Sequence, residues 1–208
     1  MSKRPGAVSA DTRERILQAA GDEFAEHGFQ GSSLRRICAA AGVTTGAIYF
    51  FFQGKDDLFE TVLSGVTTPF LAYMREHYRQ EQQLLIKAPV EKEHADLEIS
   101  LTLIDFYFRS RRTWDILLKH LGHPAVQSFL DCFVEESTDH YLSLITMADG
   151  GQPRSHPVDR FAIHQFAHMQ TDTMLTLISH DFSREEMTEH ARTVTNMLRG
   201  AFQVLLSD

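Results

Sequence analysis

Residues 32–55, SSLRRICAAAGVTTGAIYFFFQGK, predict two short helices joined by a tight turn. The first helix is indicated by four apolar residues that share one helix face, Leu34, Ile37, Cys38 and Ala41. Ser32 or Ser33 can cap its start, and Gly42 stands where a helix end favours a left-handed residue. Thr44 can cap a second helix over Thr45–Phe51. A helix, a glycine turn and a second helix form the arrangement that lays the second helix in the major groove of DNA.

The motif of this segment resembles that of the TetR family of one-component transcriptional repressors: Gly42-Val43-Thr44-x-Gly46-x-Ile48-Tyr49-x-x-Phe52-x-x-Lys55. The preceding segment, from Thr12-Arg13-x-x-Ile16-Leu17 to Phe24-x-x-x-Gly28, is similar to the family's first helix. The resemblance covers about residues 11–64, whereas residues 65–208 resemble the family only in helical character and length. Two alternatives stay open, a generic helical hairpin and a different helix-turn-helix family.

The resemblance implies an all-α protein with a helix-turn-helix DNA-binding domain over residues 11–54. A flexible arm over residues 1–10 is expected before it, and a helical effector-binding and dimerisation domain over residues 55–208 after it. The implied function is that of a repressor that binds a near-palindromic operator in double-stranded DNA as a homodimer. A small hydrophobic or aromatic effector would cause release of the operator. It would do so by favouring a conformation in which the two DNA-binding domains of the dimer no longer match the spacing of the half-sites.

The charge of the chain is unevenly distributed. A net charge of −8 does not by itself suggest a nucleic-acid-binding protein. Residues 1–55, however, contain seven Lys and Arg against five Asp and Glu, while the remainder contains 13 against 23. A mildly basic N-terminal part, here called the head, and an acidic remainder, called the body, fit a protein that contacts DNA at one end. Many helical proteins are nevertheless acidic for other reasons.

The start of the second motif helix would face the groove, so Thr45, Gly46 and Ala47 are expected at the base edges. The resemblance adds Tyr49 as a phosphate or base contact and Lys55 as a phosphate contact. It also places Arg35 beside the major groove, where its guanidinium can bind a guanine. The complete set expected at the DNA is Ser32, Arg35, Arg36, Thr44, Thr45, Gly46, Ala47, Tyr49, Phe50 and Lys55.

The chain departs from the family pattern on this helix. Many relatives carry a lysine at the position of Thr45 and histidines at those of Phe50 and Phe51. The departures remove up to three polar or cationic groups from the surface that faces DNA. They shift the expected contacts to Arg35, Arg36 and apolar groups, with Phe50 either contacting a thymine methyl group or simply exposed.

The rest of the chain predicts further helices. Residues 55–83 form one long helix in which Pro69 either introduces a kink, a possible hinge by the resemblance, or separates two helices. Other helices are predicted over 96–112, 113–121, 125–147, 158–180 and 183–206, with a loop at 149–157.

Apolar residues recur at intervals of four and three along the last helix, at Met187, Ala191, Val194, Leu198, Ala201 and Leu205. This spacing is typical of a helix-packing seam. The seam can pack inside the protein's own core, whereas the resemblance implies a four-helix bundle between two subunits. Because a protein that reads two half-sites has to be a dimer, the seam is assigned to the dimer interface.

Aromatic residues of the body suggest a pocket for an apolar effector. The candidate lining residues are Phe106, Phe108, Trp114, Phe133, Gln165, Phe166, His168 and Met169. Any one aromatic side chain on a helical stripe is nevertheless more often ordinary core.

His164, His168 and Asp172 follow one another at intervals of four, a spacing that can hold a divalent metal. Such a stripe is more often a hydrated face or a polar interface, so no metal is expected. The motifs HExxH, GxSxG, GxGxxG and the P-loop do not occur, and neither catalysis nor a cofactor is expected. The alternative function is a helical small-molecule- or metal-binding protein with an impaired DNA-reading head.

No apolar run approaches the roughly 18 residues of a membrane span, and residues 1–15 contain no apolar stretch of a signal peptide. Cys38 and Cys132, far apart in the sequence, are interpreted as two reduced thiols. These features predict a cytoplasmic protein without a membrane partner.

Overall fold

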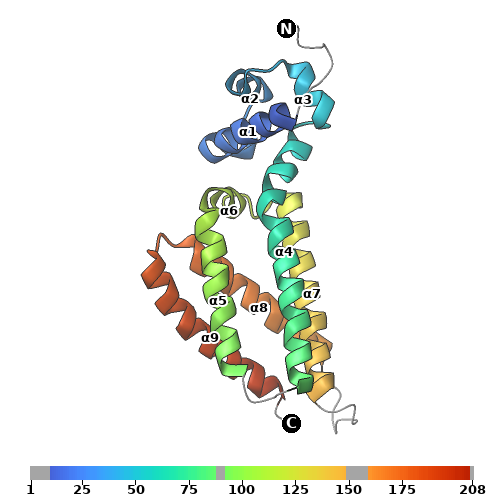
Figure 1. The fold of residues 1–208 in the computed structure, drawn as a ribbon, viewed down its shortest axis with the longest axis vertical. Helices are drawn as coiled ribbons and strands as arrows, with labels where there is room; N and C mark the ends of the chain where they lie inside the picture. Colours follow the sequence, from blue (N-terminus) through green and yellow to red (C-terminus); the bar gives the residue numbers. More distant parts are fainter. Residues whose placement is uncertain (1–9, 88–91, 149–158, 207–208) are drawn as a thin grey trace. The chain divides into compact units, whose positions relative to one another are not determined.

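The computed structural model describes the backbone of residues 10–87, 92–148 and 159–206. These residues form nine helices and no strand, which confirms the all-α class (Figure 1). The helices are α1 (Ala10–Gly31), α2 (Leu34–Ala41), α3 (Thr45–Phe51), α4 (Lys55–Lys87), α5 (Lys92–Arg109), α6 (Arg111–Leu118), α7 (Pro124–Ala148), α8 (Arg160–Ser179) and α9 (Arg184–Leu206). Among them, none is long and apolar enough to cross a membrane. The predicted arm and the predicted loop at 149–157 lie outside the described residues, apart from residue 10.

The helices fall into two compact units. The first contains the described residues up to Thr68 together with Arg111–Ala125, and the second contains Pro69–Ser110 and the described residues from Val126 onward. The first unit is thus larger than the expected head, because it includes the beginning of α4 and all of α6. Pro69 does not separate two helices, since α4 is continuous across it; a kink or hinge there stays a prediction.

The core of the first unit follows the apolar pattern of its three N-terminal helices. Ile16, Ala20 and Phe24 follow one another at intervals of four on α1 and are completely buried. Ile37 from α2 and Ile48 from α3 are also completely buried. The three helices therefore share one core, and each keeps its opposite face exposed.

Phe29 lies at the corner where α1 ends and is packed by aromatic rings from other helices. Its ring centroid is 5.0 Å from that of Phe59 on α4 and 4.5 Å from that of His123. Its backbone N–H donates to Nε2 of His120 at 2.8 Å. His120 Nδ1 lies 2.6 Å from the carbonyl oxygen of Ile116 on α6, so Nδ1 carries the proton and Nε2 accepts.

The carbonyl group of Phe29 is also bonded. It accepts hydrogen bonds from Lys55 Nζ at 2.8 Å and from Ser32 Oγ at 2.6 Å. The Lys55 ammonium group lies 4.5 Å from the centroid of the Phe29 ring, a cation–π contact. The corner therefore joins α1, α4 and the segment that follows α6.

The second unit is built on two apolar clusters. Phe70 on α4 packs against the rings of Phe106, Phe129 and Phe133, at centroid distances of 5.1 to 6.2 Å. The other cluster contains Ile145, Ile163, Phe166 and Phe202, from α7, α8 and α9. Helix α9 contacts both α5 and α8, beside which it lies in Figure 1.

A buried polar group joins α4 to α7 within this unit. The Tyr78 hydroxyl lies 2.7 Å from Ser137 Oγ, which donates to the carbonyl of Phe133, so Tyr78 is the donor. Burial raises the pKa of Tyr78 above its ordinary value and keeps the phenol protonated. His140 stacks on the Tyr78 ring and bonds through Nε2 to Glu81 at 2.9 Å. These contacts fix the register of the two helices.

An alanine at Gly28 should be harmful to the first unit. Gly28 has φ 66° and ψ 176°, a conformation that is essentially restricted to glycine, and an added Cβ would lie 3.3 Å from His120 Nε2. We expect Gly28→Ala to destabilise the protein by about 1–3 kcal/mol in urea unfolding.

The matched control is Gly21→Ala in the same helix, where an added Cβ meets nothing within 4 Å. Because alanine favours the helix interior, this change should stabilise by about 0.5–1 kcal/mol. Equal unfolding midpoints for the two variants would contradict the role assigned to Gly28.

Candidate nucleic-acid interface

The turn between α2 and α3 is set by Gly42. This residue has φ 63° and ψ 40°, the left-handed conformation predicted for it. Its N–H donates to the carbonyl of Ala39 at 3.3 Å, and the N–H of Val43 donates to that of Cys38 at 3.0 Å. These bonds satisfy carbonyl groups at the end of α2 and direct the chain into α3.

The start of α2 is capped by another helix. Ser33 and Thr44 occupy the N-cap positions of α2 and α3, but neither side chain makes the expected capping hydrogen bond. Instead Oε1 of Glu23, on α1, accepts from the backbone N–H of Ser33 and from Nε of Arg36, both at 2.8 Å. The side chain of Ser32 bonds the Phe29 carbonyl. Local capping signals could not reveal this acceptor, because it lies ten residues before Ser33.

Glu23 stays charged although it is buried. Burial by itself would raise the pKa of its carboxyl group, but the hydrogen bonds from Arg36 and Ser33 hold the pKa below the ordinary 4.5. The same pairing raises the pKa of Arg36. The guanidinium of Arg36 is therefore paired within the head, although its side chain is 51% exposed, and is only partly available to a phosphate.

The exposed face of α3 carries four of the residues expected at DNA. Thr45 and Gly46 are exposed at its start, and one turn later Tyr49 and Phe50 are 59% and 68% exposed. Ile48 points the other way into the core, and Ala47 is half-buried. The helix therefore presents one contiguous surface formed by positions one turn apart.

The cations expected at DNA differ in what they bind within the head. Arg35 is exposed, and among the described residues it has no hydrogen-bond or ion-pair partner. Arg36 is paired with Glu23. Lys55 donates to the carbonyls of Phe29 and Ser32, at 2.8 and 3.5 Å, which leaves one N–H for another acceptor. The role of all three at DNA stays a prediction.

Residues 16–62, which contain this turn and both of its helices, match the family model described as bacterial regulatory proteins, tetR family. This segment is similar to the DNA-binding domain of TetR-family proteins. The chain is 45% identical over 67 residues to the HTH-type transcriptional repressor BepR of Brucella suis biovar 1, a stretch that covers 32% of either protein. It therefore spans about a third of BepR, and the relationship in sequence concerns the head.

Solved structures extend the likeness in fold beyond the head. A putative TetR-family regulator from Syntrophomonas wolfei has a TM-score of 0.63 at 20% identity, over 90% of this chain and 94% of its own. The regulator FadR of Bacillus subtilis, solved in complex with stearoyl-CoA, has a TM-score of 0.61 at 15% identity, over 88% and 97%. At these identities the comparison shows a shared fold.

The eight residues proposed to line an effector pocket lie in separate places. Phe106 and Phe133 belong to the cluster around Phe70, and Phe166 to the cluster with Phe202. Phe108 packs on Tyr107, while Trp114 belongs to α6 in the first unit. The remaining three are Gln165, His168 and Met169. No single described pocket contains all eight, and their role stays a prediction.

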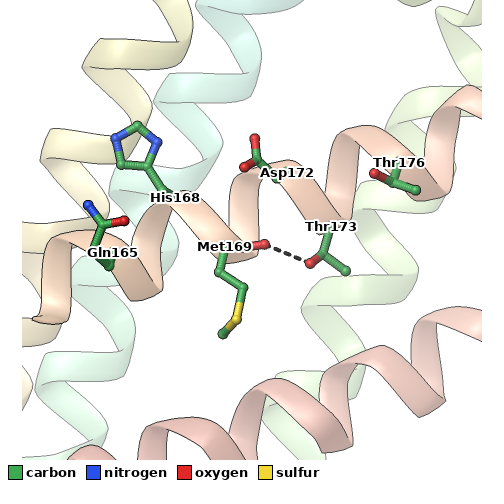
Figure 2. Close-up of a pocket in the computed structure, with 6 residues that line it drawn as sticks. All are labelled: Gln165, His168, Met169, Asp172, Thr173 and Thr176. Carbon is green, nitrogen blue, oxygen red and sulfur yellow. Dashed lines mark hydrogen bonds between the residues drawn. The ribbon is translucent and has the colours of Figure 1, made fainter.

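Gln165, His168 and Met169 line a depression of about 390 Å³ with Asp172, Thr173 and Thr176. Figure 2 shows that all six side chains come from α8. The Thr173 hydroxyl donates to the carbonyl of Met169 at 2.6 Å. Because one helix supplies the whole lining, the depression is a surface feature rather than an enclosed pocket.

The two histidines of α8, His164 and His168, lie beside each other, and His164 also contacts polar groups of α7. The rings of His164 and His168 lie 4.8 Å apart, and Nδ1 of His164 lies 3.2 Å from Thr138 Oγ1 and 3.5 Å from Glu135. No group of three or more His, Cys, Asp or Glu able to hold a metal is found in the described part of the chain.

The seam of α9 faces the protomer's own helices. Met187 and Ala191 are buried, and Val194 is half-buried. Leu198, Ala201 and Leu205 pack against the cluster that contains Phe202. Met187 and Ala191 thus belong to the protomer's own core, whereas the other four residues of the seam are only partly buried and keep some exposed surface. The location of a dimer interface stays a prediction.

Glu23 offers a pH-dependent test of the interhelical cap. We expect Glu23→Gln to destabilise the protein by about 1.5–3 kcal/mol at neutral pH, since a neutral amide loses the charge-assisted bonds to Arg36 and Ser33. The lowered pKa of Glu23 makes this contribution complete above pH 4.5 and removes it as the pH falls through the lowered value. Wild type and variant should therefore converge in acid-range urea unfolding.

The matched control is Glu26→Gln, because the Glu26 side chain is 75% exposed. It should change stability little at any pH. A Glu23→Gln difference that persisted unchanged at low pH would contradict the assigned ionisation.

Proposed function

We propose that this protein is a TetR-family transcriptional repressor that binds a near-palindromic operator as a homodimer. The observation that supports it most is the exposed face of α3, fixed by the left-handed turn at Gly42 and by the shared core beneath Ile48. A helix held in this way can enter the major groove without losing its packing. Its place of action would be the cytoplasm, where the DNA is.

A homodimer is supported by exposed apolar residues on the last two helices. Phe161 and Met169 on α8 are 67% and 43% exposed, and Met197 and Val204 on α9 are 69% and 73% exposed. Spacings of eight and seven residues place each pair on one face of its helix. Large apolar side chains gathered on helices that pack together favour association, and we propose this surface as the interface.

We further propose that a small hydrophobic or aromatic effector binds the second unit and releases the operator. The body is rich in buried rings, around Phe70 and around Phe166. FadR, which shares the fold, was solved with stearoyl-CoA, so a chain of this architecture can bind a molecule with a long apolar part. Release requires only that the ligand bind one conformation of the dimer better than the other.

The alternative is a small-molecule-binding protein whose head no longer reads DNA. The uncharged surface of α3, with Thr45 and Phe50, favours this alternative over other classes. Binding of the protein to DNA taken from upstream of its own coding region decides between them. A repressor should bind specifically and lose affinity as salt increases, whereas the alternative predicts no sequence preference.

Arg35 is the cation best placed for base recognition. We expect Arg35→Ala to weaken operator binding by about 1–3 kcal/mol and to relax the preference for one guanine, as measured by fluorescence anisotropy. The control is Arg192→Ala, which removes an exposed arginine from α9. If Arg35→Ala leaves the ratio of operator to random-DNA affinity unchanged, Arg35 does not read the sequence.

Two adjacent residues of α9 test the dimer surface. Met197 is exposed, and Met197→Glu should give a monomer of unchanged helicity in sedimentation, because association would bury an unpaired charge. Leu198 packs against the internal cluster, so Leu198→Glu should instead lower the stability of the fold. A dimeric Met197→Glu protein would rule out this surface as the interface.

A further inference from the structure

The exposed surface of α3 is aromatic and uncharged. Its seven residues, Thr45–Phe51, include no Asp, Glu, Lys or Arg. Phe50 has 68% of its surface exposed although phenylalanine is usually buried, and Tyr49 beside it is 59% exposed. A surface of this kind gains most from contact with another apolar group.

The Phe50 ring contacts a neighbouring aromatic ring, which in turn contacts a ring of the core. The ring of Phe50 packs edge-on against Phe51, with centroids 5.0 Å apart and planes at 87°. Phe51 packs against Phe52 at 6.1 Å, and Phe52 is buried in the core of the head. The position of the exposed ring is therefore constrained by a row of contacts that ends in the core.

The surface next to Phe50 is open. Side chains of a helix lean over the preceding turn, which brings Phe50 toward the position of Gly46. An added Cβ at Gly46 would meet only Thr44 Oγ1, at 3.8 Å. No side chain at Gly46 covers this part of the helix, so a small group of another molecule can approach the Phe50 ring there.

Resting on the proposed function, we infer that α3 recognises its half-site through the 5-methyl groups of thymines, with Phe50 as the main contact and Tyr49 beside it. A phenyl ring cannot exchange hydrogen bonds with base edges, and the thymine methyl is the apolar group that the major groove presents. The operator half-site should therefore contain thymine under α3. Arg35, from the neighbouring helix, would supply the polar contact.

Uracil in place of thymine tests the inference, because it removes only the methyl group. Selection of full-length protein on a pool of random duplexes first gives the preferred half-site. Each thymine in that half-site is then replaced by uracil in synthetic duplexes, and affinity is measured by anisotropy. We expect at least one replacement to weaken binding about fourfold in one half-site, the factor for burying one methyl-sized group.

Variants at Phe50 link the effect to the residue. Phe50→Ala should weaken binding to the thymine duplex and lose its sensitivity to the critical uracil, the non-additivity expected of groups in contact. Phe50→Leu, which keeps an apolar side chain, should retain part of that sensitivity. Circular dichroism should be unchanged, because the ring is exposed.

The outcomes separate this inference from the proposed function. If the protein selects a sequence but every uracil replacement affects wild type and Phe50→Ala equally, the methyl readout is refuted and the repressor proposal stands. A preferred half-site without thymine would refute it in the same way. If no sequence is enriched and binding is equal for all duplexes, the proposed function itself fails.

Discussion

The backbone of Phe29 is the point on which the arrangement of the head depends. Its N–H is bound by His120 and its carbonyl by Lys55 and Ser32, so both polar groups of one residue are satisfied by other segments. An unsatisfied polar group at a buried position would cost about 1–3 kcal/mol. Because the chain reaches Phe29 through the left-handed Gly28, the direction in which it continues into α2 is fixed at the same place.

The hydrogen bonds at Phe29 occupy polar side chains that were expected to contact DNA. Lys55 and Ser32 were expected to contact DNA, yet both donate hydrogen bonds to the Phe29 carbonyl. Arg36 is likewise paired with Glu23. Lys55 and Arg36 thus help to hold the helices of the head together, and under the proposed function recognition falls mainly to Arg35 and to the uncharged face of α3. The corner also binds His120, which follows α6 and belongs to the same unit although it lies 91 residues further along the chain.

The parts of the structure that depend on short segments could be predicted from the sequence. The buried faces of α1, α2 and α3 and the left-handed Gly42 follow from periodicity and from the properties of glycine. Contacts between distant segments could not be predicted. Glu23 as the cap of α2 and His120 as the acceptor for Phe29 depend on which helices meet. The spacing on α9 identified an apolar seam. Periodicity alone does not tell whether such a seam packs against helices of its own subunit or against a partner subunit. The exposed Met197 lies outside that spacing.

Hydrogen–deuterium exchange of the full-length protein, with and without its selected duplex, tests most directly whether α3 is the surface that reads DNA. Peptides that cover residues 34–53 should gain more protection on binding than any others, because α2 and α3 would lie against the duplex. Peptides of α9 that cover Met197 should not gain protection of similar size, since that surface would already be covered in the free dimer. Specific binding with unchanged exchange over residues 34–53 would contradict the account.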